Sequence, residues 1–491
     1  MLAIDQSTTA TKVMLFDRTG SLIKRVNKPH QQLYPQTDFV EHDPVLIWDN
    51  TLAGLTGVVE EAQIKVDEVA GIAITNQRET AMLWDKVTGK PVHNAVVWQC
   101  LRGVEFCEQL KAEGYAETIK SKTGLIIDSY FSASKLKWIM DHVPGVKDLA
   151  AEGKLMMGTM DSWLLWKLTG GKVHATDFSN ASRTMLFNIQ ELKWDEELLA
   201  LCGLSNVNLP EVRFSDEVFG ITDPEVVFGQ ELPVAGLLGD SHAALFGQHC
   251  LSVGMAKATY GTGSSIMMNI GNEFKESPAG LVTSIGWGAG KTIDYVFEGN
   301  IHCAGDTLNW LVNDLELISG AHETEELAVS VPDNNGVYLV PAFVGLGAPH
   351  WNHQARACLS GMPRNTKKAH VVRAGLESIA FQVADLIYLM GSGSGISLKE
   401  LRVDGGPTKN RFLMQFQSDL LQKEVVVSDI EEVSALGATY MAGLATGFWS
   451  DQEEIKALRK VKSSYTAEMT DEKVNEVYAG WKKAVERALI V

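Results

Sequence analysis

The sequence predicts an α/β fold made of two similar halves, because the same strand–turn–strand unit occurs twice along the chain. The first turn spans residues 5–12 (DQSTTATK) and the second spans 261–265 (GTGSS). Each turn separates two short apolar runs, which is typical of a hairpin. The strands expected around the turns are 2–4 and 13–16 in the first unit, and 256–260 and 266–270 in the second.

Both turns have the composition of a phosphate-binding loop. Small residues let backbone N–H groups approach an anion closely, while the hydroxyl groups and Lys12 supply further donors. One such turn would be weak evidence, since Ser, Thr and Gly are ordinary hairpin residues. Two turns in matching settings favour a duplicated fold that holds a nucleotide phosphate from both sides, and therefore a phosphoryl-transfer protein.

Size and charge limit the classes of protein and partner. A chain of 491 residues with 45% hydrophobic and 21% charged residues should form two or three ordinary globular domains. Its net charge of −18 argues against nucleic-acid binding, which requires a basic face. Lys and Arg are spread along the chain and no apolar run reaches membrane-spanning length, so we expect no membrane partner.

Cysteine and histidine usage favours a reduced, cytoplasmic protein without a zinc site. The six cysteines include no CxxC pair, and His350 and His353 lack a second pair of metal ligands nearby. Met1 precedes the first expected strand almost directly, which leaves no space for a cleaved targeting peptide. We therefore expect cytoplasmic localisation.

The order of the expected elements predicts a domain boundary near residue 250. Asp43 and Pro44 predict the start of a helix after the first hairpin, since Asp is a good N-cap and Pro suits the first turn. Around 237–248 a strand gives way to a helix that begins with small residues, and the second turn follows. The predicted domains are 1–250 and 251–491.

Two glycine-rich stretches in the second half have different expected roles. The stretch 391–395 follows an expected helix at 370–390 and precedes a strand, so we expect a flexible connector. Gly405 and Gly406 instead follow a strand and precede a helix. Their missing side chains would let a flat base or a ribose lie against the backbone.

Two aspartates are candidates for the chemistry of a kinase, which needs a carboxylate for Mg²⁺ and a base for the acceptor hydroxyl. Asp5 lies at the mouth of the first turn and is well placed for the metal. Asp240 lies at a strand–helix junction among small residues and is the best candidate for the base. Taken alone, Asp240 is better explained as a helix N-cap.

Longer motifs in the expected order resemble those of a known family. The chain resembles the FGGY carbohydrate kinases of the actin/hexokinase-like superfamily, and among them most closely the glycerol kinases. The resemblance extends over essentially the whole length and implies two actin/hexokinase-like (ribonuclease H-like) domains around a central cleft. The matching stretches are TNQRET (75–80), VWQC (97–100), YFSASKLKW (130–138), NASRTMLFN (180–188), GLGAP (345–349) and FLMQFQSD (412–419).

The resemblance implies ATP and Mg²⁺ as cofactors, with Asp5 and Asp240 near the metal. Lys12 replaces the more usual Arg, which keeps the charge but loses the planar fork. Asn309 stands where Gln is common. The positions that match the family's ATP site are Thr8, Thr9, Lys12, Gly261, Thr262, Gly263, Gly305, Asn309, Gly405, Gly406 and Asn410.

The resemblance also implies a binding site for a small polyol or sugar. Arg78 and Glu79 would hydrogen-bond hydroxyl groups, Trp98 would pack on the carbon chain beside Tyr130, and Asp240 would take the proton of the attacking oxygen. Taken alone, an Arg78–Glu79 pair would more often be a solvated ion pair. In a loop that also matches at the neighbouring motifs, the binding role is favoured.

The acceptor site departs from the glycerol kinase pattern at two positions. Ser241 stands where these enzymes usually have Gln, and Ser265 stands where they usually have Phe. The loss of a packing ring and a hydrogen-bonding amide should weaken discrimination in favour of a three-carbon substrate. Two hypotheses remain open: a longer acceptor of four or five carbons, polyol or ketose, or glycerol itself with the gap refilled by neighbours or water.

Other functions stay as alternatives. Pentulose kinases such as xylulokinase typically carry Gly-Gln-Met-His where this chain has NQRE at 76–79, which argues against a typical member of that group. An actin-like or chaperone-like ATPase switch would share the two turns but would need no polar acceptor pocket. The sequence leaves the oligomeric state open, a homo-oligomer included.

Overall fold

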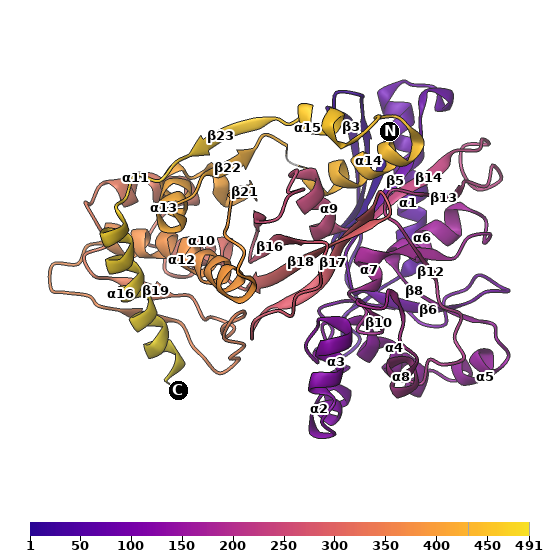
Figure 1. The fold of residues 1–491 in the computed structure, drawn as a ribbon, viewed down its shortest axis with the longest axis horizontal. Coiled ribbons are helices and arrows are strands. Elements are labelled where there is room, and N and C mark those ends of the chain that lie inside the picture. Colours follow the sequence, from indigo (N-terminus) through magenta and orange to yellow (C-terminus); the bar gives the residue numbers. More distant parts are fainter. Residues whose placement is uncertain (431, 491) are drawn as a thin grey trace.

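The computed structural model describes residues 1–430 and 432–490 and contains one large open sheet in each half of the chain (Figure 1). The sheet of the first half has six strands in the order β13-β14-β5-β1-β2-β3. Its central strands are apolar and buried, as expected of strands covered on both faces. The strands are β1 (Leu2–Gln6), β2 (Ala10–Phe16), β3 (Leu22–Pro29), β5 (Ile72–Asn76), β13 (Val218–Ile221) and β14 (Pro233–Gly239).

The sheet of the second half has seven strands in the order β17-β18-β16-β15-β21-β22-β23. It repeats the first sheet with one strand added at its edge. The strands are β15 (Met255–Tyr260), β16 (Ser264–Gly271), β17 (Val282–Ala289), β18 (Thr292–Ile301), β21 (Glu400–Gly405), β22 (Val425–Ser428) and β23 (Val461–Tyr465).

The two sheets share one pattern of strand directions. In the first, β3, β2 and β1 are antiparallel, β5 and β14 run parallel to β1, and β13 turns back antiparallel. In the second, β18, β16 and β15 are antiparallel, β21 and β22 run parallel to β15, and β23 turns back. The prediction of a duplicated α/β fold built on two hairpins is therefore confirmed.

Three helices show which local sequence signals were informative. In α1 (Pro44–Ala62), Asp43 accepts hydrogen bonds from the N–H groups of Val45 and Leu46, so the expected cap is present. In α9 (Asp240–Gly247) the N-cap is Gly239, so the alternative explanation of Asp240 as a cap is wrong.

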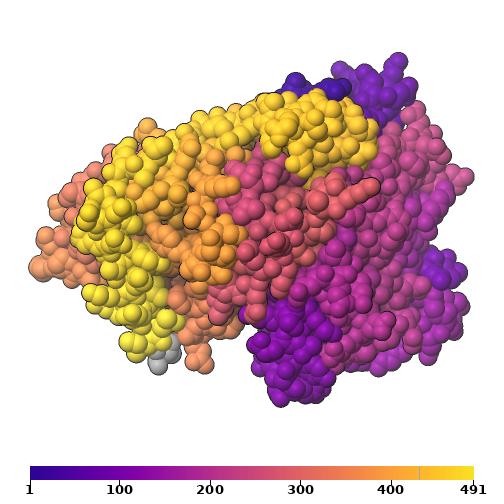
Figure 2. Space-filling model, in the orientation of Figure 1, coloured from indigo at the N-terminus to yellow at the C-terminus, as the bar shows by residue number. Residues whose placement is uncertain are grey.

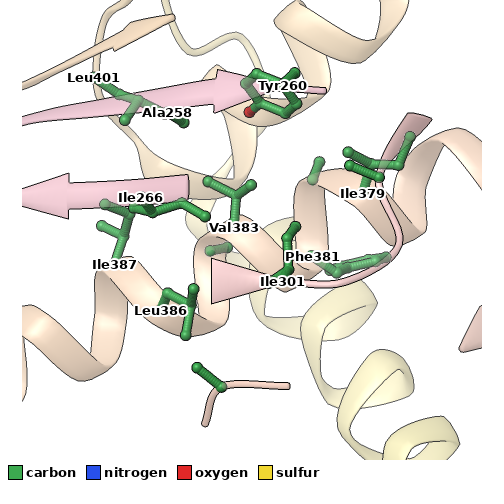
Figure 3. Close-up of a cluster of buried hydrophobic side chains, with 14 of the residues drawn as sticks. Ala258, Tyr260, Ile266, Ile301, Ile379, Phe381, Val383, Leu386, Ile387 and Leu401 are labelled. Carbon is green, nitrogen blue, oxygen red and sulfur yellow. The ribbon is translucent and has the colours of Figure 1, made fainter. Parts of the chain in front are cut away.

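The helix α12 (Lys368–Ser394) is longer than expected and includes most of the stretch predicted as a flexible connector. It ends only at Gly395, whose φ of 71° is left-handed. The glycine and serine residues did not end the helix earlier, since it continues for four residues beyond Met390, its last buried residue. Figure 3 shows Val383, Leu386 and Ile387 of this helix near Ala258 and Ile266 of the second sheet.

A helix from the second half completes the core of the first. The helix α14 (Val433–Thr446) packs on β1, β5 and β14 and crosses α9. Figure 1 shows it beside the strands of the N-terminal half. At the crossing, a Cβ on Gly437 would overlap the carbonyl oxygen of Ala243, so the two backbones touch. The halves therefore share a buried apolar cluster rather than being joined by a loose linker.

Smaller elements complete each half. A four-stranded sheet, β4-β7-β6-β8, lies in the N-terminal half. The further elements there are β4 (Glu41–His42), β6 (Ala81–Asp85), β7 (Ala95–Val96), β8 (Leu155–Thr159), β9 (Ala175–Asp177), β10 (Phe187–Asn188), β11 (Lys193–Trp194), β12 (Glu211–Arg213), the 3₁₀ turn Val66–Glu68, α2 (Val104–Ala112), α3 (Ala116–Thr123), α4 (Ser132–His142), α5 (Val146–Ala151), α6 (Met160–Leu168), α7 (Phe178–Ala181) and α8 (Glu196–Leu201).

In the C-terminal half the further elements are α10 (Gly305–Asn309), the π-helical turn Trp310–Asp314, the 3₁₀ turns Ala321–Glu323 and Gly406–Lys409, α11 (Thr324–Val329), β19 (Tyr338–Val340), β20 (Cys358–Ser360), α13 (Arg411–Leu421), α15 (Gln452–Ala457) and α16 (Asp471–Leu489). Figure 2 shows a notch in the outline at the lower edge, between the purple N-terminal half and the salmon part of the C-terminal half. Among the described residues, no helix is long and apolar enough to span a membrane.

Candidate active site

The topology brings the predicted acceptor residues to one edge of the first sheet. β1, β5 and β14 are parallel and end in register, with Gln6 opposite Asn76 and Asn76 opposite Gly239. The carboxyl ends of parallel strands in open α/β sheets are the usual place for a ligand. The first turn, the loop with Arg78 and Glu79, and Asp240 all follow these ends.

Arg78 joins Asp240 to a residue of the second half. Its Nε lies 3.2 Å from Asp240 Oδ1, and its two terminal nitrogens donate to Glu298 at 2.9 and 2.8 Å. The guanidinium is buried, and the paired contact with Glu298 fixes its plane. Asp240 therefore has a cation held in a fixed position on one side.

Glu79 is held by a different arginine. Arg183, in the loop after α7, donates from Nε to Glu79 at 2.6 Å and also lies 2.8 Å from Glu298. Arg78 and Glu79 therefore do not form the solvated pair that the two residues suggest by themselves. Both are buried, and each bonds to a partner distant in the sequence.

The charges of this network determine the ionisation of its members. Burial by itself would raise the pKa of Glu298, but Arg183 and Arg78 hold that pKa far below its usual range. Burial lowers the pKa of His242, and the charge of Arg78 adds to the effect, so this histidine is neutral. The network thus contains two guanidinium groups and an ionised carboxylate between them.

Sequence reasoning assigned no role to Glu298 or Arg183. Arg183 lies inside the motif at 180–188, but the spacing of that motif does not indicate which carboxylates pair with it. Glu298 could have been noticed in the sequence. It directly follows the apolar residues Tyr295–Phe297 of β18, and a buried acid is rarely unpaired.

The aromatic residues of the predicted acceptor site are adjacent. The rings of Trp98 and Tyr130 pack edge to face with centroids 5.4 Å apart, and Trp98 Nε1 donates to Thr8 Oγ1 at 3.0 Å. That bond ties the acceptor residues to the first turn. The Nζ of the buried Lys135 donates to the carbonyl groups of residues 129–131, which fixes the backbone around Tyr130.

Asp5 and Lys12 lie together at the foot of the first hairpin. Lys12 Nζ is 3.9 Å from Asp5 and 2.9 Å from Glu432, which precedes α14. Burial raises the pKa of Asp5, Lys12 opposes this effect, and Asp240 and Glu432 add to it, so the pKa lies at about 7. Carboxylates that repel one another here suit a divalent cation, and Mg²⁺ commonly takes only one or two of them, with phosphate oxygens and water completing its shell.

Six of the predicted nucleotide residues form a second group at the carboxyl ends of β15 and β21: Gly261, Thr262, Gly263, Gly305, Gly405 and Gly406. The N–H of Gly305 donates to the carbonyl of Gly261 at 2.9 Å, and the N–H of Asp306 donates to that of Thr262 at 3.1 Å. A Cβ on Gly305 would lie 2.6 Å from the carbonyl oxygen of Gly261, so glycine is needed for this approach. The second turn and the start of α10 are thus one unit.

Glycine is also required where β21 ends. Gly405 has a φ of 101°, and a Cβ there would overlap the carbonyl oxygen of Tyr260. Gly406 faces open space, with no atom within 4 Å of a Cβ placed on it. An uncovered backbone at this place is what the sequence predicts for contact with a flat base or a ribose.

Two predicted nucleotide residues are not joined to the turns. Asn410 caps α13 by accepting from Leu413 N at 2.9 Å, and its amide donates to Thr324 at 3.0 Å. Asn309 is exposed at the end of α10. Among the residues that the structure describes, no hydrogen bond links either side chain to the two hairpins.

The two positions that depart from the glycerol kinase pattern are in contact. Ser265 Oγ lies 3.4 Å from Ser241 Oγ, and Ser241 follows Asp240 directly. The volume lost at the two positions is therefore contiguous and borders the candidate base. Lys257 lies behind them, with its Nζ 3.3 Å from Ser265 Oγ.

Known family models match both halves of the chain. The N-terminal domain of the FGGY family of carbohydrate kinases matches residues 1–247, and the C-terminal domain of the same family matches residues 256–446. The two matches together account for most of the sequence and for both sheets apart from the edge strand β23.

Relatives match over the full length. A protein named glycerol kinase 2 from Thermotoga maritima is 50% identical over 489 residues, which is 100% of this chain and 98% of the relative. A glycerol kinase from Bacillus cytotoxicus is 50% identical over 99% of this chain and 98% of its own length.

Solved structures also match over nearly the whole chain. The Plasmodium falciparum glycerol kinase with ADP has a TM-score of 0.95 at 36% identity and covers 100% of this chain and 98% of its own. A xylulose kinase from Lactobacillus acidophilus has a TM-score of 0.87 at 21% identity over 99% of this chain and 97% of its own, which shows the shared fold.

Proposed function

The chain belongs to the FGGY family of carbohydrate kinases, and from this premise we propose that it transfers the γ-phosphate of ATP to a terminal hydroxyl of a four- or five-carbon polyol or ketose. As a member it is an ATP-dependent, glycerol kinase-like enzyme acting on a small polyol or sugar. The proposal concerns the acceptor and the residues that act on it.

Asp240 is the proposed general base. It follows the carboxyl end of β14, and the guanidinium of Arg78 lies 3.2 Å from its carboxylate. Arg78 and Glu79 hydrogen-bond acceptor hydroxyls, while Trp98 and Tyr130 pack on the carbon chain. Arg183 and Glu298 position these groups and do not themselves react.

The ATP phosphates are proposed to lie between the two turns. Thr8, Thr9 and Lys12 approach from the first half, and Gly261–Gly263 with Gly305 from the second. The adenosine lies over Gly405 and Gly406, near Asn309 and Asn410. Asp5, with Asp240, would hold Mg²⁺, which neutralises charge on the transferred phosphoryl group.

The observation that carries the acceptor proposal is the contact between Ser241 and Ser265. Because the two small side chains are neighbours at 3.4 Å beside the base, the missing amide and ring leave one continuous space. A longer carbon chain can occupy that space, and the hydroxyl groups can bond to its additional oxygens.

Glycerol is the second candidate, favoured by the names of relatives that are 50% identical over the full length. Both candidates use the same base and nucleotide residues. They differ only in whether the space at Ser241 and Ser265 is filled by substrate.

The proposed enzyme acts in the cytoplasm and needs neither nucleic acid nor a membrane. We propose that its two domains meet at residues 250/251, between the end of α9 and the start of β15. The oligomeric state, a homo-oligomer included, is left to measurement of mass in solution.

ADP release measured with three-, four- and five-carbon polyols and ketoses tests the proposal. We expect the largest kcat/KM for an acceptor of four or five carbons. A Ser241→Gln, Ser265→Phe double variant should move selectivity toward glycerol. Preference for glycerol in the unmodified enzyme would select the second candidate, and ADP release that no acceptor stimulates would support an ATPase switch instead.

A further inference from the structure

A buried lysine stands behind the two serines of the acceptor site. Lys257 lies in the apolar strand β15 and is completely buried. Thr259 is two residues further along the same strand and is paired in register with Ser265 of β16. The three side chains therefore share one face of the sheet. The helix α9, with Ser241 in its first turn, packs on both strands.

Lys257, Thr259, Ser265 and Ser241 form a strip of polar side chains, and the lysine fixes the direction of its hydrogen bonds. An ammonium group only donates, so Ser265 Oγ at 3.3 Å must accept from Lys257. The hydrogen of Ser265 is then free to be donated, and Ser241 Oγ lies 3.4 Å away. These bonds are long, as is common in an active site before substrate binds.

The strip ends at a hydrogen with no acceptor. Ser241 Oγ receives the hydrogen of Ser265, so its own hydrogen must point elsewhere. Among the described residues, no group accepts it. Ser241 and Ser265 are partly exposed, and the N–H of Ser241 donates to Asp240 at 2.6 Å. The free hydrogen therefore lies at the acceptor site, beside the base.

Burial lowers the pKa of Lys257, and Asp404 at the other end of the strip opposes this effect. Lys257 also donates to Thr259 Oγ1 at 3.2 Å, and Thr259 in turn donates to Asp404 at 3.3 Å. Asp404 accepts a further bond from Gln248 at 2.8 Å. A buried carboxylate with two donors supplies the countercharge that a buried ammonium requires. The direction Lys257 to Ser265 to Ser241 is thus set by the surrounding protein.

We propose that Lys257 is a specificity residue that acts through Ser265 to make Ser241 a fixed donor, and that the matching acceptor is a ketose. This inference rests on the proposed function and names its substrate class. A carbonyl oxygen only accepts hydrogen bonds, so it complements a fixed donor fully. An alcohol at the same place brings a hydrogen of its own, which needs an acceptor that the strip does not offer.

Matched pairs of ketose and polyol test the proposal. ADP release is measured with dihydroxyacetone and glycerol, erythrulose and erythritol, and ribulose and ribitol. The ketose of the best pair should have a kcat/KM about tenfold higher than its polyol, the worth of one well-placed hydrogen bond. A preference for the polyols would overturn the inference while leaving the kinase proposal intact.

Variants then locate the cause. Ser265→Ala interrupts the strip without removing a charge and should lower the ketose-to-polyol ratio of kcat/KM by about threefold or more. Ser264→Ala is the matched control, because its hydroxyl is buried next door with no hydrogen-bond partner among the described residues. The control should keep the wild-type ratio.

Lys257→Met gives a second measurement that does not depend on Ser265. If it folds, it should lower the ratio as Ser265→Ala does; if it does not fold, the Ser265→Ala result decides. An unchanged ratio in Ser265→Ala would overturn the inference. Failure of every acceptor to stimulate ADP release would overturn the proposed function and this inference together.

Discussion

The two halves repeat one arrangement of strands but use it differently. At the ends of β1, β5 and β14 the first half presents charged side chains, among them Arg78 and Asp240. At the ends of β15 and β21 the second half presents glycine backbone, with Gly261, Gly305 and Gly405 in close approach. The same frame therefore supports recognition by side chains in one half and by backbone in the other.

The difference also shows where the halves depend on each other. The arginines of the first half are held by Glu298, which comes from β18 of the second. The glycine turns need no such partner, because their N–H groups bond to carbonyls of their own half. The proposed acceptor site in the first half should thus be sensitive to the loss of a charge. The proposed nucleotide site in the second half should be sensitive to a side chain added at a glycine.

Glu298→Gln should have the largest effect on stability. The change leaves Arg78 and Arg183 buried without their shared carboxylate, which typically costs about 3–5 kcal/mol in the free energy of unfolding. Urea unfolding followed by fluorescence measures this cost. Glu432→Gln, in a partly exposed cluster with Lys12 and Arg25, is the control and should cost about 1 kcal/mol or less. Equal losses of stability in the two variants would show that the Glu298 network contributes no more than the partly exposed cluster around Glu432.

Asp240→Asn should have the largest effect on turnover with little effect on the fold. A general base usually contributes about 10²–10⁴ in rate, so kcat should fall by at least about 100-fold. Binding of ADP, measured by calorimetry, should stay within about twofold, because the proposed adenosine site lies in the other half. Near-normal kcat would remove Asp240 from the mechanism.

A pair of glycine variants separates fold from binding on the nucleotide side. Gly405→Ala forces a left-handed φ and a clash with Tyr260, and should cost about 1–3 kcal/mol of stability. Gly406→Ala meets open space and should leave the free energy of unfolding unchanged. If the base or ribose lies on this backbone, Gly406→Ala should nevertheless weaken ADP binding severalfold. Unchanged ADP affinity in that variant would move the nucleotide away from this loop.

A pH dependence of stability is expected in the first half. His42 is fully buried, and its Nδ1 accepts a hydrogen bond from the side-chain amide of Gln77 at 3.1 Å. Burial, with a contribution from His30, lowers the pKa of His42 to about 3. Because the pKa in the folded state lies below that of the unfolded chain, His42 contributes stability above pH 6.5. This contribution is lost as the pH falls from 6.5 toward 3, at about 1.4 kcal/mol per unit.

The variant His42→Asn keeps a hydrogen-bonding partner for Gln77 but does not titrate. Between pH 6.5 and 4.5 its free energy of unfolding should fall less steeply than that of the unmodified enzyme, by the equivalent of about one proton. Parallel slopes would show that acid destabilisation begins elsewhere. The C-terminal half offers a comparison in Asp385, whose pKa burial raises to about 6, so that its contribution to stability is lost as the pH rises.

Much of the fold could be predicted because its signals are local. Asp43 caps the expected helix, both hairpins occur where the apolar runs and small residues predict them, and the glycines at 405 and 406 follow a strand as expected. The prediction of a flexible connector at 391–395 was wrong, because it relied on a local composition that favours a loop. The stretch instead continues a helix that is buried as far as Met390, and the length of that helix is not visible in five residues.

The pairing within the site could be predicted less well. The sequence placed Arg78, Glu79 and Asp240 in one site but named no charge partner elsewhere in the chain for Arg78 or Glu79. In the structure each of the two bonds to a residue far along the chain, Arg78 to Glu298 and Glu79 to Arg183. Charge partners separated by 100 or more residues leave no spacing pattern, since only folding sets their distance.

The sequence by itself determined the duplicated frame, the family, the use of ATP and the presence of serine at positions 241 and 265, because each is a property of residue types in a local order. Only the tertiary structure decided that these two serines touch, that Lys257 stands behind them and that Glu298 joins the two halves. Hydrogen bonds and ion pairs act over a few ångströms, so their partners are defined by the packed chain and not by its order.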